Sequence, residues 1–95
     1  MNNKLKDDNT DTLFDALLTL KTRDELYCFF EDLCTISEIK AMAQRFLVAK
    51  LLDEGVVYTE IEQKTGASSA TISRVNKCLH YGADGYNTAI ERLKK

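Results

Sequence analysis

Apolar residues recur at helical spacing along most of the chain, and no segment shows the alternation of a half-buried strand. Capping residues and glycines interrupt this pattern and mark where one helix ends and the next begins. The helices predicted in this way cover residues 12–20, 22–34, 35–54, 58–66, 68–79 and 86–94. We therefore expect an all-α fold of six or seven helices, with a flexible tail at residues 1–10 and a single domain at residues 11–95.

Several of the expected helix starts carry a threonine followed three residues later by a glutamate, which is the pattern of a capping box. These pairs are Thr22 with Glu25, Thr35 with Glu38, and Thr59 with Glu62. Asp84 is a candidate cap for the last helix, in which Ile90 and Leu93 would face inward. In the long helix that runs to about Glu54, a break near Ala43 or Gln44 would raise the helix count to seven. Its expected inward stripe consists of Ile39, Met42, Ala43, Phe46, Leu47, Leu51 and Leu52.

Residues 58–79 have the pattern of a helix, a tight turn and a second helix. Gly66 can adopt the left-handed conformation that ends the first helix, and Ser68 or Ser69 can cap the second. In the second helix, Ile72, Val75 and Leu79 form one apolar stripe. The residues expected to face the major groove of DNA are Ser68, Ser69, Ala70, Thr71, Ser73, Arg74, Asn76 and Lys77. Small hydroxyl residues and Arg can reach base edges and phosphates there, so this helix-turn-helix predicts DNA binding.

Helix pairs of this kind also occur in all-helical proteins that never touch DNA. The alternative function is therefore a helical protein-interaction module without DNA binding, in which the second helix is only a surface feature. Glu62 favours this alternative, because many helix-turn-helix motifs have a small residue at its position.

The segment Gly-Ala-Ser-Ser-Ala-Thr-Ile-Ser-Arg, from Gly66 to Arg74, resembles the reading segment of the Trp repressor superfamily, most closely its YerC/YecD branch. Residues 35–39 and 43–52 also resemble that family, and the similarity extends from about Leu13 to Leu93. The resemblance implies an intertwined homodimer that presents two reading helices to successive major grooves of a double-stranded DNA operator. It thus implies a sequence-specific DNA-binding transcriptional regulator that acts as a repressor.

In the Trp repressor, tryptophan lies between the central core and the reading head, where two arginines hold it. By resemblance these arginines correspond to Arg45 and Arg74, which are the candidate effector-binding residues. Val75 replaces a glycine beside the indole ring, and Cys78 replaces a serine one turn further on. We therefore expect no cofactor, do not expect tryptophan as the corepressor, and leave any other small effector unknown. For Arg45, a surface or interdomain ion pair is the alternative interpretation.

The first helices carry more apolar surface than one small core can cover. Leu13, Phe14, Leu17, Leu18, Phe29, Phe30, Leu33 and Phe46 cannot all face the same interior. A second copy of the chain related by two-fold symmetry would cover the excess, so a homodimer is expected independently of the resemblance.

Charge is distributed unevenly along the 95 residues, whose net charge is −2. Residues 1–54 hold seven Lys or Arg against eleven Asp or Glu, whereas residues 55–95 hold six against four. The predicted reading helix thus lies in the basic half. We expect modest non-specific DNA affinity with a strong dependence on salt.

The remaining chemistry of the sequence is sparse. Cys28, Cys34 and Cys78 show no metal-ligand spacing, and Cys28 and Cys34 are expected to be buried, reduced thiols. His80 is the only histidine, and no nucleophile elbow or P-loop is present, so an enzyme is not expected. The apolar runs are too short to span a membrane and the first residues lack a signal peptide, so a cytoplasmic location is expected.

Overall fold

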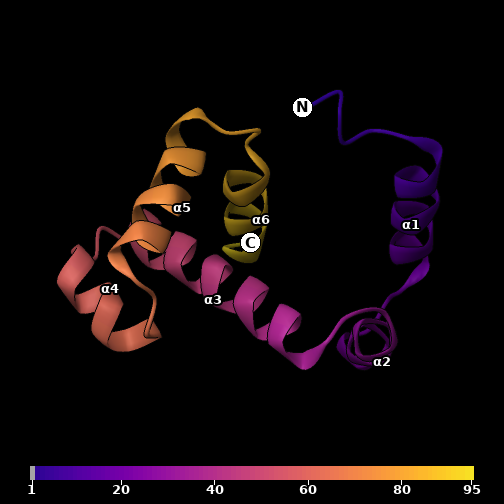
Figure 1. Ribbon diagram of the computed structural model, residues 1–95, viewed down its shortest axis with the longest axis horizontal. Helices are drawn as coiled ribbons and strands as arrows, with labels where there is room; N and C mark the ends of the chain where they lie inside the picture. The colour runs from indigo at the N-terminus through magenta and orange to yellow at the C-terminus, as the bar shows by residue number, and fades with distance from the viewer. Residues whose placement is uncertain (1) are drawn as a thin grey trace. The chain divides into compact units, whose positions relative to one another are not determined.

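The computed structural model describes residues 2–95, and its regular elements in that range are six α-helices without a strand. The helices are α1 (Asp8–Thr19), α2 (Arg23–Leu33), α3 (Ile36–Asp53), α4 (Tyr58–Thr65), α5 (Ser69–Tyr81) and α6 (Gly85–Leu93) (Figure 1). The all-α prediction is confirmed for this part of the chain, with the lower of the two expected helix counts.

Two of the three predicted capping boxes are present. The Glu25 N–H donates to Thr22 Oγ1 at 3.1 Å, and the Thr22 N–H donates to Glu25 Oε1 at the same distance. At the start of α3, the Glu38 N–H donates to Thr35 Oγ1 at 3.1 Å, and the Thr35 N–H donates to Glu38 Oε1 at 2.8 Å. The bond from the Thr35 backbone lowers the pKa of Glu38, because it stabilises the charged carboxylate.

The first helix begins earlier than the predicted start at Thr12. Asp7 is its cap, and its Oδ1 accepts a hydrogen bond from the Thr10 N–H at 2.7 Å. This bond lowers the pKa of Asp7, as expected for a carboxylate at a helix N-terminus. Residues 8–10, expected in the tail, therefore belong to α1. The sequence signal for this earlier start was Asp7 followed by acidic residues in the first turn, which are favourable at a helix N-terminus.

Two further details of the prediction are wrong, and a third is right only in position. The helix α4 begins at Tyr58, and its cap residue Val57 makes no side-chain cap bond, so Thr59 does not cap it. The helix α3 is continuous through Ala43 and Gln44, because residues 41–49 contain good helix formers and neither glycine nor proline. Asp84 occupies the N-cap position of α6 as predicted, but its side chain makes no cap hydrogen bond and accepts from Asn87 Nδ2 at 3.2 Å.

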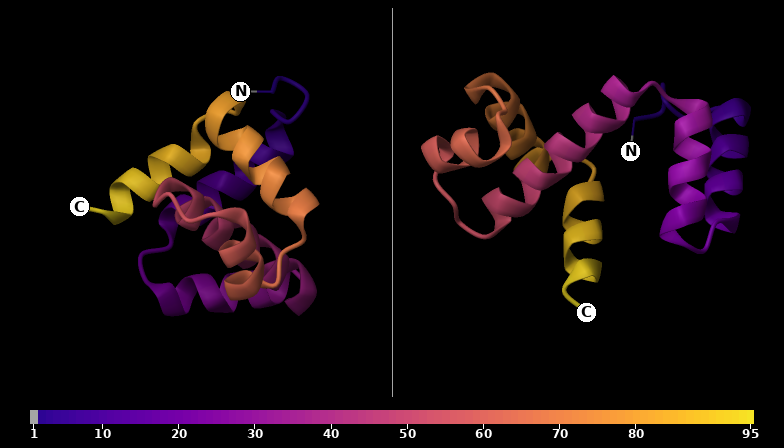
Figure 2. Two further views of the ribbon diagram at one scale, coloured as in Figure 1. Left: turned by 90° about the vertical axis from the view of Figure 1, so that its left-hand side faces the viewer. Right: turned by 90° about the horizontal axis from the view of Figure 1, so that it is seen from below.

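The chain divides into two compact units, Met1–Ile39 and Lys40–Lys95, and each is described separately. The second unit contains a core from α3, the α4–α5 region and α6, formed by Val48, Ala49, Ile61, Ala67, Ile72, Val75 and Ile90. Here α5 lies against both α4 and α6 (Figures 1 and 2). Met42, Ala43 and Leu47 were expected to face inward but are exposed, because Val48 and Ala49 form the buried face of α3.

The first unit has no buried side chain among its described residues. Leu18 is 82% exposed, Phe14 is 48% exposed, and the most sheltered apolar side chains are only half-buried. The prediction of buried thiols is also wrong within a single chain, since Cys28 is exposed and Cys34 is only half-buried. The apolar excess inferred from the sequence is therefore present on the surface of one chain.

The core of the second unit gives a direct stability test. Ile72→Ala should lower the free energy of unfolding by about 2–5 kcal/mol, because it leaves a cavity where the isoleucine is fully buried. Urea unfolding at a fixed protein concentration measures the change. Tyr81→Ala, at a position that is 85% exposed, is the control and should change stability by about 0.5 kcal/mol or less. Equal stability of the Ile72 variant and the control would contradict this assignment of the core.

Candidate nucleic-acid interface

A tight turn at Gly66 connects α4 to α5. Gly66 has a φ of +74°, in the left-handed region that favours glycine, which confirms its predicted role. Thr65 Oγ1 donates to the Ile61 carbonyl at 2.7 Å and accepts from the Ala67 N–H at 3.1 Å. From α3, the Gln44 Nε2 donates to the Thr65 carbonyl at 3.0 Å. The turn is thus hydrogen-bonded both within itself and to α3, which fixes where α5 begins.

One face of α5 is packed into the core. Ile72 is fully buried, Val75 is 2% exposed and Leu79 is half-buried, as the sequence stripe predicted. Ile61 of α4 is fully buried in the same cluster. These contacts determine which side of α5 remains available for a partner.

The predicted DNA-facing residues lie on the other sides of α5 and at its start. Ser68, Ser69, Ala70, Ser73, Arg74 and Lys77 are exposed, and Thr71 and Asn76 are half-buried. Ser68 caps the helix, because its Oγ accepts from the Thr71 N–H at 3.2 Å and donates to Thr71 Oγ1 at 3.1 Å. Ser69 and Ser73 make no side-chain hydrogen bond within residues 2–95, so their hydroxyls are available to a partner.

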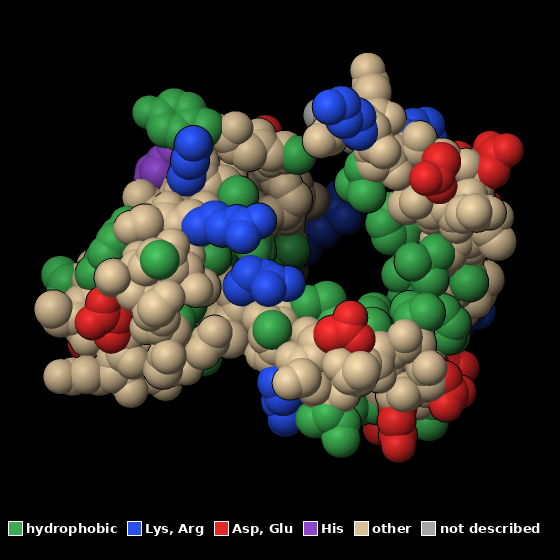
Figure 3. Space-filling model, viewed as in Figure 1, with side chains coloured by type: hydrophobic (Ala, Val, Ile, Leu, Met, Phe, Trp, Pro, Cys, Tyr) green, Lys and Arg blue, Asp and Glu red, His purple; other side chains and the backbone are tan. Residues whose placement is uncertain are grey.

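The exposed charge of α5 is entirely basic. The helix contains Arg74, Lys77 and His80 but no Asp or Glu. Basic side chains gather over α5 and the adjoining part of α3, where Arg45 lies (Figure 3). Within residues 2–95, Arg45, Arg74 and Lys77 take part in no ion pair. Their charges are therefore available to phosphates, although the net charge of the chain is negative.

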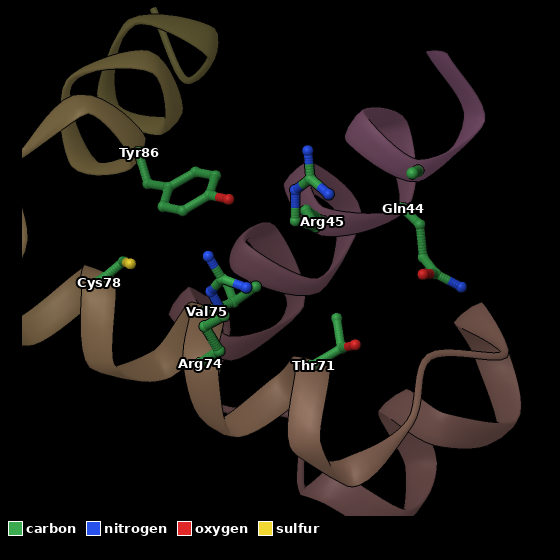
Figure 4. Close-up of a pocket in the computed structure, with 8 residues that line it drawn as sticks. Gln44, Arg45, Thr71, Arg74, Val75, Cys78 and Tyr86 are labelled. Atoms are coloured by element: carbon green, nitrogen blue, oxygen red, sulfur yellow. The ribbon is translucent and has the colours of Figure 1, made fainter. Parts of the chain in front are cut away.

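A pocket of about 480 Å³ separates part of α3 from α5. It is lined by Ala41, Gln44, Arg45, Thr71, Arg74, Val75, Cys78 and Tyr86 (Figure 4). The structure thus brings Arg45 and Arg74 to the same pocket, although they are far apart in the sequence. The ion pair that was the alternative for Arg45 has no carboxylate partner within the described residues.

Sequence reasoning missed Tyr86, which enters this pocket from α6. Its ring centroid lies 6.3 Å from that of Phe46 on α3, at an interplanar angle of 35°. The available signal was its spacing of four residues from Ile90, which places both side chains on one face of α6. Leu93, which was expected to face inward, is 63% exposed.

The sequence matches the family described as Trp repressor protein over residues 8–94. The chain belongs to the Trp repressor family. It is 53% identical over 92 residues to the protein YerC of Bacillus subtilis (strain 168), covering 97% of this chain and 88% of that protein. A 61-residue match, covering 63% of this chain and 60% of the relative, is 39% identical to the Trp operon repressor homolog of Chlamydia caviae.

Solved structures agree with this membership of the Trp repressor family. The crystal structure of a TrpR-like protein from Eubacterium eligens ATCC 27750 superimposes with a TM-score of 0.94 at 58% identity, covering 98% of this chain and 96% of that one. The fold is therefore that of the TrpR-like proteins, and the family is one of DNA-binding transcription regulators rather than enzymes. None of the helices in the part of the chain that the structure describes has the length and apolar character needed to cross a membrane.

The cap of α5 generates a test that separates the serine that caps the helix from an exposed serine of the same helix. Ser68→Ala should destabilise the protein by about 0.5–2 kcal/mol, because the Thr71 N–H then loses its acceptor. Ser73→Ala, at an exposed position without a side-chain hydrogen bond within residues 2–95, should change stability by about 0.5 kcal/mol or less. Thermal unfolding followed by circular dichroism compares the two variants. A neutral Ser68→Ala would show that the cap contributes nothing.

Proposed function

We propose that this protein is a sequence-specific DNA-binding transcriptional repressor, that it acts as a homodimer, and that α5 reads the major groove of its operator. The observation that carries the proposal is the outer surface of α5. Within residues 2–95, its Ser69 and Ser73 hydroxyls make no hydrogen bond and its Arg74 and Lys77 form no ion pair, and the helix contains no acidic side chain. Membership in the Trp repressor family supports the same function.

The residues of α5 divide into two proposed roles. Ser69, Ala70 and Ser73 are small and exposed near the N-terminal half of the helix, the part that reaches base edges in helix-turn-helix proteins. Arg74 and Lys77 carry the charge that would contact phosphates, which supplies affinity but little sequence information. Ser68, Thr71 and Asn76 are assigned to the rim of the interface, since the hydroxyls of Ser68 and Thr71 are already engaged in the cap and Asn76 is half-buried.

The proposed homodimer would cover the first unit. Its apolar side chains, including Leu18, are too exposed in one chain for a stable compact unit of this size. A symmetric dimer brings a second copy of the same surface against them and also presents two copies of α5. Two linked reading helices would bind a palindromic operator more tightly than one.

Tryptophan is not proposed as the corepressor. Val75 places an isopropyl group on the side of α5 that faces the core, and it is 2% exposed, so it is a packing residue as well as a pocket residue. Admitting an indole ring beside it would require repacking. Because the proposed partner is chromosomal DNA, we infer that the protein acts in the cytoplasm.

The dimer is tested by mass in solution. Light scattering at micromolar concentration should give about 22 kDa, twice the chain mass of 10.8 kDa. Leu18→Glu should shift the mass toward that of one chain, because it introduces a charge into the surface proposed to be covered. As control, Glu60→Gln, in α4, should leave the mass unchanged. A wild-type mass of 10.8 kDa at this concentration would refute the homodimer.

DNA reading is tested on duplexes that the wild-type protein selects from a random pool. Ser69→Ala should weaken binding to the selected duplex by about 1–3 kcal/mol, because it removes a base contact, and should leave binding to unrelated DNA unchanged. Lys77→Ala should weaken both alike and reduce the salt slope by about one unit, because it removes a phosphate contact.

Lys95→Ala is the matched control for charge, since Lys95 follows α6 and its ammonium group lies 3.9 Å from Glu91. It should leave the salt slope unchanged. If the wild-type protein selects no duplex at low salt, the DNA-binding function is wrong and the interaction-module alternative is favoured.

A further inference from the structure

Tyr86 lies between α3 and α5 in the second unit. It is half-buried, its ring lies beside Phe46 of α3, and it lines the pocket together with Arg74 and Val75 of α5. In Figure 4 the ring enters the pocket from α6 with its hydroxyl end directed toward Arg45, and Arg74 lies beside the ring. One side chain thus occupies part of the space between α3 and the helix proposed to read DNA.

The helix that carries Tyr86 is held to both neighbours. Toward α5, Asn87 Nδ2 donates to the Leu79 carbonyl at 2.9 Å. Toward α3, Lys94 Nζ donates to Asp53 Oδ2 at 2.9 Å, and this contact raises the pKa of Lys94 because it stabilises the charged ammonium group. Between them, Ile90 is buried in the core at 3% exposure. The position of Tyr86 is therefore determined by contacts to the two helices that it separates.

We propose that Tyr86 is a built-in positioning residue: its ring fills the space between α3 and α5 and holds α5 in the DNA-reading orientation without any bound ligand. The pocket beside the ring has a volume of about 480 Å³ with the ring in place, and removing the ring would enlarge this space and leave α5 without the side chain that lies between it and α3. The buried stripe of α5, its packing against α4 and the Asn87–Leu79 hydrogen bond would oppose a large displacement, so the expected movement is a small change in the orientation of α5. An α5 that samples several orientations binds DNA more weakly, in proportion to the fraction of molecules in the competent orientation.

The test compares side chains at position 86 under conditions where each variant is folded by circular dichroism. Tyr86→Ala should weaken binding to the duplex selected by the wild-type protein about tenfold, which corresponds to one molecule in ten in the competent orientation. Tyr86→Phe keeps the ring and should bind within about threefold of wild type. If Tyr86→Ala does not fold, Tyr86→Leu replaces it, because it keeps apolar volume but leaves the ring's outer part empty.

Chemical rescue distinguishes positioning from general stability. The compound p-cresol is a small-molecule analogue of the tyrosine side chain and carries the phenol group that Tyr86→Ala removes. At millimolar concentration it should restore most of the DNA affinity of this variant. It should not affect wild type, nor Tyr81→Ala, which removes the same atoms from an exposed position. Ile90→Val, which loosens the core without emptying the pocket, should keep the DNA affinity of wild type while losing some stability. L-tryptophan at the same concentration should not change the DNA affinity of wild type.

The inference rests on the proposed function only where DNA affinity is measured. A second measurement, hydrogen exchange, needs no DNA. In the free protein, Tyr86→Ala should make hydrogen exchange of the α5 amides about tenfold faster, with p-cresol reversing the effect. Failure of the wild type to bind DNA would overturn the proposed function alone. If folded Tyr86→Ala matches wild type in both DNA affinity and α5 exchange, or if p-cresol reverses neither change, Tyr86 does not position α5.

Discussion

The burial of one face of α5 is the constraint on which the rest of the second unit depends. Ile72 and Val75 of α5 belong to the same small core cluster as Val48 and Ala49 of α3. Because this cluster has few side chains, each one contributes a large share of its buried area. Everything on the outer surface of α5, from its hydroxyls to its cations, is oriented by this one inward face.

Charge placement explains how an acidic chain can approach DNA. The acidic residues are concentrated in the first 54 positions, whereas α5 has none. The attraction is therefore local, and the rest of the molecule repels the phosphate backbone. Such an arrangement limits binding at wrong sites, since non-specific affinity depends mainly on the number of phosphates that cations neutralise.

The sequence predicted those features that depend on neighbours in the chain. Gly66 was assigned correctly and the cap of α5 was narrowed to Ser68 or Ser69, because a left-handed turn and a helix cap have local chemical requirements. Local rules failed at the start of α4. Thr59 has the side chain of a good cap, but the helix already begins at Tyr58 without any side-chain cap. The pocket residues Arg45 and Arg74 came from family resemblance, and their proximity follows only from the fold. Tyr86 was missed because its partner Phe46 lies 40 positions away, and no periodic pattern encodes that contact.

The described residues of the first unit include no buried side chain in one chain, and this has a consequence for how the protein would behave in a cell. If a second copy supplies the missing cover, ordering of that unit becomes a function of protein concentration. In newly made or diluted chains, α5 would then be folded while the first unit keeps exposed apolar side chains and is accessible to proteases. Proteases would degrade single chains faster than dimers. The amount of dimer would therefore increase more than in proportion to the rate of synthesis. The activity of the protein would in this way begin only above a threshold concentration of the chain, without any bound ligand.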